Sequence, residues 1–409
     1  MEDNNRIEMP GEPVDTADLN PESSDKPVLS IKGLNSPPQQ QPPHSPAAES
    51  PSIASSARKN NIGFIRLLAA SMVIVSHSPE LIDGDRSREP LMRVFGTLSL
   101  GEVAVDIFFL ISGYLITRSY LTTRHWNYVT RRVGRIYPGY LVAYFLCIFA
   151  VGPMAGVPIS LLNRASYAKI VGHAMWLDMP RLKAFATQHF HFLNGSMWTL
   201  SYELRCYLFL LLAGVLGVYK KRAILLCLPV VLLFSHIAIT KYFNSPSSSV
   251  SLLQKVLIGD PVLLTRFMFV FACGSVFYLF QDKIKYSGKG ACLCVLGLLA
   301  LMFNRTLAEP ALCSLGAYAL FYFAFKSKYI NINNSYDISY GVYLYAWPFA
   351  ALILLHYPAI TQMELSVFTF ILAVIAGTIS WYAVEKPAAK LLRRLEAGHQ
   401  RSQGAALAG

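Results

Sequence analysis

The chain has 409 residues, of which 54% are hydrophobic and only 15% charged, with a mean hydropathy of +0.39. A typical soluble domain carries about 25% charged residues. The composition therefore excludes an ordinary soluble enzyme, a disordered regulator and a secreted disulfide-rich scaffold. It indicates an integral, all-α membrane protein.

The first 60 residues have a different composition from the rest of the chain. They contain 10 of the 23 prolines and no aromatic residue or cysteine. Such a segment cannot bury enough apolar surface to offset the entropy of ordering it, so we expect 1–60 to be a disordered cytoplasmic tail. The seven cysteines lie in or beside apolar segments without a C-x-x-C pair, which favours buried thiols and predicts no metal site.

Apolar segments of membrane-spanning length follow the tail. A helix needs about 20 apolar residues to cross a bilayer, and by this criterion we expect about ten crossings within a transmembrane domain over 61–390. A short cytoplasmic tail, 391–409, completes the predicted domain organisation. The predicted spans are 61–78, 100–118, 136–155, 197–217, 222–241, 260–280, 289–305, 307–325, 336–356 and 364–384.

The distribution of basic residues predicts the orientation. With both termini in the cytoplasm, the inside segments hold 23 Lys and Arg residues and the outside loops hold 10. Short cytoplasmic loops of membrane proteins are enriched in these residues. We therefore expect both termini to be cytoplasmic.

Two ionisable residues lie in the first predicted span. Arg66 and His77 are eleven residues apart, so they share one helix face and are separated by roughly 16 Å along the axis. Charged and polar groups inside a bilayer are costly and often functional. The alternative is an arginine that snorkels to the headgroups and a histidine at the interface.

Two carboxylates lie in later spans at a predicted depth similar to that of His77. Asp106 is in the second span and Glu203 is in the fourth. A carboxylate beside a histidine orients the ring and raises its basicity, so these groups predict a polar cavity with His77 as a general base. For Glu203, a structural ion pair with Arg205 is the alternative.

The second inside loop ends in a cluster of arginines. Arg132 and Arg135 are three residues apart and, in a helix, would bind phosphate groups with their forked guanidinium groups. The general enrichment of basic residues in cytoplasmic loops is the alternative explanation. His189 and His191, in the long loop after the third span, lack the accompanying acidic residues of a metal site.

Six sequence blocks together resemble the membrane-bound acyltransferase 3 family, whose members O-acylate bacterial surface glycans. The resemblance covers 60 to about 395. In relatives the block around Tyr343 often continues into a histidine, whose place is taken here by Ala346. The blocks are Arg66 to His77, Gly101 to Leu115, Arg132 to Pro138, Trp198 to Glu203, Asp337 to Leu344, and Val384 to Pro387.

The resemblance implies an enzyme that takes an acyl group, usually acetyl, from cytoplasmic acyl-CoA and transfers it to a glycan hydroxyl outside. Acyl-CoA would be a donor substrate and not a bound cofactor. Arg132 and Arg135 would bind the CoA phosphates, and the pantetheine arm would run from Arg66 toward His77. Glu203 or Asp106 would orient the His77 ring.

The implied partners are acyl-CoA, membrane lipids and a glycan or lipid-linked oligosaccharide acceptor, with no nucleic acid. The implied location is the bacterial inner membrane. A proton-coupled transporter that uses Asp106, Glu203 and His77 as a relay is the alternative. The acceptor glycan, the acyl group and the oligomeric state stay open at this point.

Overall fold

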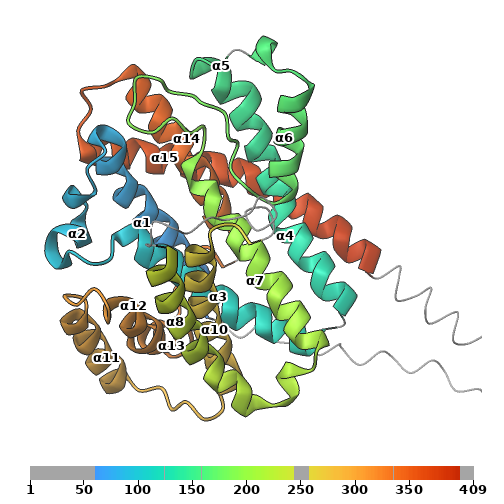
Figure 1. Ribbon diagram of the computed structural model, residues 1–409, viewed down its shortest axis with the longest axis vertical. Helices are drawn as coiled ribbons and strands as arrows, with labels where there is room; N and C mark the ends of the chain where they lie inside the picture. Colours follow the sequence, from blue (N-terminus) through green and yellow to red (C-terminus); the bar gives the residue numbers. More distant parts are fainter. Residues whose placement is uncertain (1–59, 124, 158, 244–257, 335, 397–409) are drawn as a thin grey trace, which may run out of the picture. The chain divides into compact units, whose positions relative to one another are not determined.

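The computed structural model describes residues 60–123, 125–157, 159–243, 258–334 and 336–396, which all belong to one unit, Arg58–Gly409. The predicted disordered tail lies outside the described residues except for Asn60, and so does 397–409. The described chain is helical (Figure 1). Its helices are α1 (Ile62–Asp83), α2 (Pro90–Phe95), α3 (Leu100–Thr122), α4 (His125–Leu146), α5 (Gly152–Met154), α6 (Arg164–Met175), α7 (Trp198–Val215), α8 (Arg222–Phe243), α10 (Pro261–Leu279), α11 (Gly288–Leu301), α12 (Ala308–Ala311), α13 (Ala317–Lys326), α14 (Ser339–His356) and α15 (Gln362–Ser380).

Seven of the predicted spans correspond to helices that are long and apolar enough to cross a membrane, so the polytopic all-α prediction is confirmed. The other three predicted spans correspond to α7, α11 and α14. Of these, α11 has only 14 residues, and α7 and α14 have 18 each. The number of ten crossings and the cytoplasmic position of both termini stay predictions.

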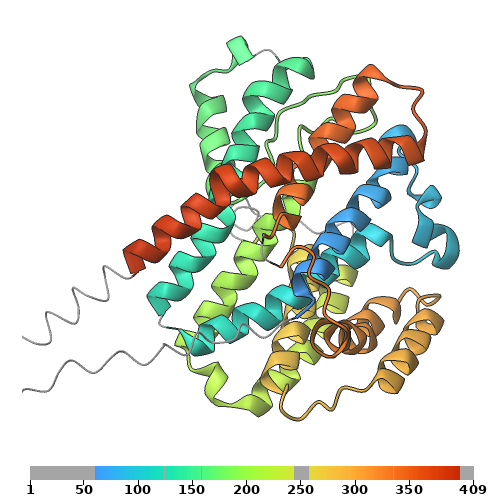
Figure 2. The same ribbon diagram turned by 180° about the vertical axis from the view of Figure 1, so that it is seen from behind.

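The interior is formed by α1, α3, α10 and α14. Helix α3 packs on α1 and on α10, and α1 also packs on α14. Helix α15 covers α14 and α1, and its continuation through Trp381–Glu385 reaches α4, so the C-terminal helix crosses one side of this group (Figure 2). Helix α1 therefore contacts α3, which follows it closely in the sequence, and α14 and α15 from the C-terminal part of the chain.

The close contact of α3 with α10 depends on glycines. A Cβ atom on Gly113 would collide with the carbonyl oxygen of Phe271, and one on Gly274 would collide with that of Leu110. Small residues let helices in membranes approach until their backbones touch. Gly113 and Gly274 therefore allow the backbones of α3 and α10 to touch.

We expect Gly113→Ala to destabilise the protein by about 1–3 kcal/mol, because the new methyl group forces α3 away from α10. The melting temperature of the detergent-solubilised protein measures this effect. Gly172→Ala in α6 is the matched control, since a Cβ there meets nothing within 4 Å. An unchanged melting temperature for Gly113→Ala would contradict the packing argument.

The segment between α4 and α7 folds back along α4 and does not form a simple outside loop. The Tyr144 hydroxyl donates to the Ile170 carbonyl of α6 at 3.0 Å, and that of Tyr137 donates to Met175 at 2.7 Å. Tyr137 lies about 25 Å along the helix axis from the end of α5 at Met154. Helix α6 therefore descends beside α4, as Figure 1 shows, and the following segment reaches α7 from within the bundle.

Candidate active site

His77 forms a hydrogen-bonded pair with Glu80, one turn further along α1. The Nδ1 atom of His77 lies 3.0 Å from Oε2 of Glu80, and Oε1 of Glu80 accepts from Nε of Arg86 at 2.7 Å. Residues three apart in a helix share a face, so the spacing brings the two side chains together. A carboxylate only accepts hydrogen bonds, so this contact requires a proton on Nδ1, and in the neutral ring Nε2 then keeps its lone pair.

The prediction that Glu203 or Asp106 orients the His77 ring is therefore wrong, because Glu80 has this position. The sequence contained a usable signal, the His-x-x-Glu spacing within one helix. The His77 side chain is 23% exposed and that of Glu80 is 10% exposed. The imidazole is thus accessible while the carboxylate that holds it is largely shielded.

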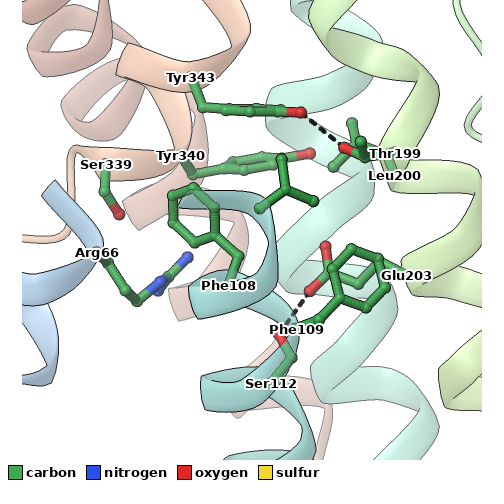
Figure 3. Close-up of a pocket in the computed structure, with 11 residues that line it drawn as sticks. Arg66, Phe108, Phe109, Ser112, Thr199, Leu200, Glu203, Ser339, Tyr340 and Tyr343 are labelled. Atoms are coloured by element: carbon green, nitrogen blue, oxygen red, sulfur yellow. Dashed lines mark hydrogen bonds between the residues drawn. The ribbon is translucent and has the colours of Figure 1, made fainter. Parts of the chain in front are cut away.

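A cavity lies between α1, α3, α7 and α14, toward the Arg66 end of α1 (Figure 3). Arg66 and Glu203 face it from opposite sides, and the ring of Phe108 contributes to its apolar part. Its lining combines hydroxyl groups with apolar walls. The lining residues are Arg66, Val105, Phe108, Phe109, Ser112, Thr199, Leu200, Glu203, Ser339, Tyr340 and Tyr343.

Glu203 is held in this cavity by two hydroxyl groups. Ser112 of α3 donates to its Oε1 atom at 2.9 Å, and Tyr207, one turn further along α7, donates to the same oxygen. These are the described partners of Glu203, so the alternative of a structural pair with Arg205 does not apply. The hydrogen bonds fix the carboxylate at the cavity wall.

The structure places Glu203 at the depth of Arg66, not beside His77 as expected. The expectation assumed that α7 begins at the outer surface. Instead, the residues before α7 are buried, and the Asn194 side chain donates to the Leu344 carbonyl in α14 at 2.7 Å. Because α7 starts within the bundle, Glu203 lies deeper than a count from the surface suggests.

Asp106 also lies apart from His77. Its carboxylate is fully buried, and Nη2 of Arg266 donates to both its oxygens, at 3.0 and 2.9 Å. The Nε atom of Arg266 lies 2.6 Å from Oε1 of Glu309. This ion-pair cluster joins α3, α10 and α12, and Asp106 is absent from the cavity lining. His77, Asp106 and Glu203 were expected to lie around one polar cavity. In the structure each of them belongs to a separate group of hydrogen-bonded or ion-paired residues.

We expect Arg266→Met to destabilise the fold by about 3–5 kcal/mol, because it leaves two carboxylates without their shared cation. The melting temperature in detergent and the amount of protein in membranes measure this. Arg93→Met, at an exposed position on α2, is the control. A melting temperature equal to that of the control variant would show that the cluster is not structural.

The arginines predicted to bind phosphate, Arg132 and Arg135, lie in the first half of α4. The Asp337 carboxylate forms ion pairs with both Arg66 and Arg135, the latter at 2.7 Å. One negative charge shared by two guanidinium groups leaves a net positive charge. The Nε atom of Arg132 is buried and has no hydrogen-bond partner among the described residues. Arg132 therefore retains donor capacity for an anion, while the carboxylates of Glu203 and Glu385 act on Arg135 together with that of Asp337.

Within the described ranges, no three or more His, Cys, Asp or Glu side chains gather as they would around a metal ion. The site therefore offers an imidazole held by a carboxylate and, at the Arg66 end of the same helix, a cavity lined by Arg66 and Glu203. An imidazole of this kind can remove a proton from a hydroxyl group.

Comparison with known proteins agrees with this chemistry. The sequence model of one family, described as an acyltransferase domain, matches residues 59–385. An O-acetyl transferase of Shigella phage Sf6 is 27% identical over 343 residues, covering 80% of this chain and 96% of that protein. Nodulation protein 10 of Rhizobium leguminosarum bv. viciae is 26% identical over 373 residues, covering 84% of this chain and 96% of that protein. No solved structure matches the chain.

The family match extends over most of the chain, and the chain spans nearly the full length of both relatives. The matched region includes the histidine pair, the cavity and the arginine cluster. The chain therefore belongs to the acyltransferase 3 family and is a multi-pass membrane O-acyltransferase.

Proposed function

We propose that the protein transfers an acetyl group from cytoplasmic acetyl-CoA to a hydroxyl of a cell-surface or exported glycan, in the inner membrane of a bacterium. The observation that carries the proposal is the His77–Glu80 pair, because its free Nε2 is suited to remove a proton from a sugar hydroxyl. The relative from phage Sf6 is an O-acetyl transferase, which supports acetyl as the transferred group. O-antigen and exopolysaccharide are the acceptors we favour.

The donor would enter from the cytoplasmic side. Arg132 and Arg135 bind the phosphates of the CoA, and Arg66 lies where the pantetheine arm passes into the cavity. The Tyr343 hydroxyl donates to the Ser196 carbonyl and bonds to Thr199, so the Thr199 hydroxyl oxygen is the group that can accept from an amide N–H of that arm, and the apolar walls are suited to its methyl groups. Arg66 and His77 are separated by roughly 16 Å along α1, and the arm spans this distance.

The reaction then proceeds by direct transfer. His77 Nε2 takes the proton of the acceptor hydroxyl while the oxygen attacks the acyl carbon, and a new C–O bond forms. The C–S bond breaks, and the imidazolium returns the proton to the CoA thiolate. Glu80 stabilises the imidazolium, since its carboxylate bonds to Nδ1.

The proton-relay alternative requires a continuous path through Asp106, Glu203 and His77. The described partners of these residues are Arg266 for Asp106, Ser112 and Tyr207 for Glu203, and Glu80 for His77. No hydrogen bond among the described residues joins one group to another. The arrangement therefore supports the transferase.

The proposal is tested with membranes that contain the protein and are supplied with radiolabelled acetyl-CoA. We expect label in base-labile ester on extractable glycan.

In Arg132→Gln, the KM for acetyl-CoA should rise about 10- to 100-fold, because a hydrogen bond to a charged group contributes about 1.5–3 kcal/mol.

Arg131→Gln is the matched control, because Arg131 is exposed and forms its ion pair with Glu396. Its KM should stay within about threefold of the wild-type value. Equal KM values for the two variants would overturn the assignment of Arg132 to CoA. Absence of labelled ester in the wild-type membranes would overturn the function itself.

A further inference from the structure

Trp347 lies beside His77 with an unused hydrogen-bond donor. Its ring, in the middle of α14, meets the imidazole edge to face, with 5.0 Å between ring centroids. The residue is 6% exposed, and its Nε1 atom is buried with no partner among the described residues. Buried indole N–H groups usually find an acceptor, and leaving one unpaired costs about 1–3 kcal/mol.

The position of the indole is fixed on several sides. Phe190 packs on it edge to face at 5.8 Å between centroids, and a Cβ on Gly195 would lie 2.7 Å from its six-membered ring. Gly195 is thus the residue that lets the chain pass this close to Trp347. A side chain held this tightly keeps its donor pre-organised, which is the property an enzyme needs where charge develops.

Two further polar atoms nearby are buried and unpaired. In the part of the chain that the structure describes, the hydroxyl oxygen of Ser196, next to Gly195, has no hydrogen-bond partner. The same holds for the side-chain oxygen of Gln188, whose amide nitrogen donates to the carbonyl of Ala351 at 2.6 Å. Ala351 lies one turn after Trp347 on α14. Unpaired polar atoms of both donor and acceptor type around one turn of α14 indicate a site that receives a polar ligand.

We propose that Trp347 is a catalytic residue, whose indole N–H donates a hydrogen bond to the acyl oxygen as negative charge develops on it. This inference rests on the proposed function. The reaction needs a base for the hydroxyl proton and a donor for the oxyanion, and His77 with Glu80 supplies only the base. When the acceptor oxygen attacks, the carbonyl becomes an alkoxide that accepts from Nε1–H. When the C–S bond breaks, the carbonyl re-forms and the thiolate takes the proton from His77.

The test removes the N–H group in two ways. Trp347→Phe keeps an aromatic ring, and incorporation of benzothienylalanine at position 347 keeps the indole shape with sulfur in place of N–H. For both, kcat for acetyl transfer should fall about 10²- to 10³-fold, the usual effect of losing one oxyanion donor. The KM values for acetyl-CoA and acceptor should change less than about threefold, and Trp381→Phe should behave as wild type.

Each other outcome has a defined meaning. A wild-type kcat with benzothienylalanine would overturn the proposal, because shape alone would then suffice. An increase in acceptor KM at unchanged kcat would also overturn it, since Trp347 would then bind substrate and transition state equally. His77→Ala is measured in parallel: if it abolishes transfer while the Trp347 variants keep it, only the role of Trp347 fails. Absence of transfer in the wild type would overturn both.

Discussion

Replacing His77 with glutamine is expected to lower the rate of acetyl transfer by about 10²- to 10⁴-fold, the usual contribution of a general base. The amide has no basic nitrogen, so the acceptor hydroxyl must lose its proton to water. Affinity for acetyl-CoA should not change, because Arg132 and Arg135, which we assign to CoA, lie on α4, and His77 does not line the cavity proposed for the pantetheine arm. Transfer of labelled acetyl to glycan and direct binding of acetyl-CoA measure the two effects.

His356→Gln is the matched control for this variant. His356 lies exposed at the end of α14, where its Nδ1 atom contacts the carbonyl of Leu352 at 2.9 Å. The His356→Gln protein should transfer acetyl at the wild-type rate. A His77→Gln protein that is folded and fully active would remove the base from the mechanism.

The second large effect is expected for Glu80→Gln, with kcat lowered about 10²- to 10⁴-fold. In a hydrolase triad, replacing the carboxylate by an amide has a comparable effect, because the ring takes the wrong tautomer and the imidazolium loses its counter-charge. The KM values should change little, since Glu80 acts through His77 and touches neither substrate. Steady-state kinetics at varied acceptor and donor concentrations separates the two parameters.

The variant Arg86→Gln shows whether Glu80 acts by positioning the His77 ring or by stabilising the end of α1. Arg86 bonds to the opposite oxygen of Glu80, so its loss leaves the contact with His77 in place. We expect less than about a tenfold decrease in kcat, the equivalent of one exposed charged contact. If both variants lose activity equally and melt at the same lowered temperature, Glu80 holds the end of α1 and does not position the ring.

The sequence predicted the helical membrane fold well because bilayer-spanning helices have a strong signal in length and hydropathy. The sequence indicates Arg66 and His77 as candidate site residues because their spacing puts them on one face of a single helix. The same local reasoning would have found Glu80, three residues after His77. Such relations can be predicted from one sequence because helix geometry alone connects the residues.

The predictions that were wrong depend on tertiary structure. The depth of Glu203 depends on where α7 begins, and this is set by the segment that folds back along α4 with its end buried against α14. The partner of Asp106 is Arg266, 160 residues further along the chain. Pairings at such separation leave no spacing pattern in one sequence.

Trp347 illustrates the same limit at the candidate site. In the sequence it is one of several aromatic residues in an apolar helix, and such residues most often contribute to packing or to the membrane interface. Only the structure shows that its ring lies against His77 and that its N–H has no described partner. A donor is recognised as unused only when its surroundings are known.

The most direct test of the account uses sealed, inside-out membrane vesicles with acceptor glycan enclosed in the lumen. Radiolabelled acetyl-CoA is added only to the exposed cytoplasmic face. The account predicts base-labile labelled ester on the enclosed glycan with the wild-type protein and none with His77→Ala. Labelled ester formed equally by His77→Ala, or no ester on the enclosed glycan despite bound acetyl-CoA, would contradict it.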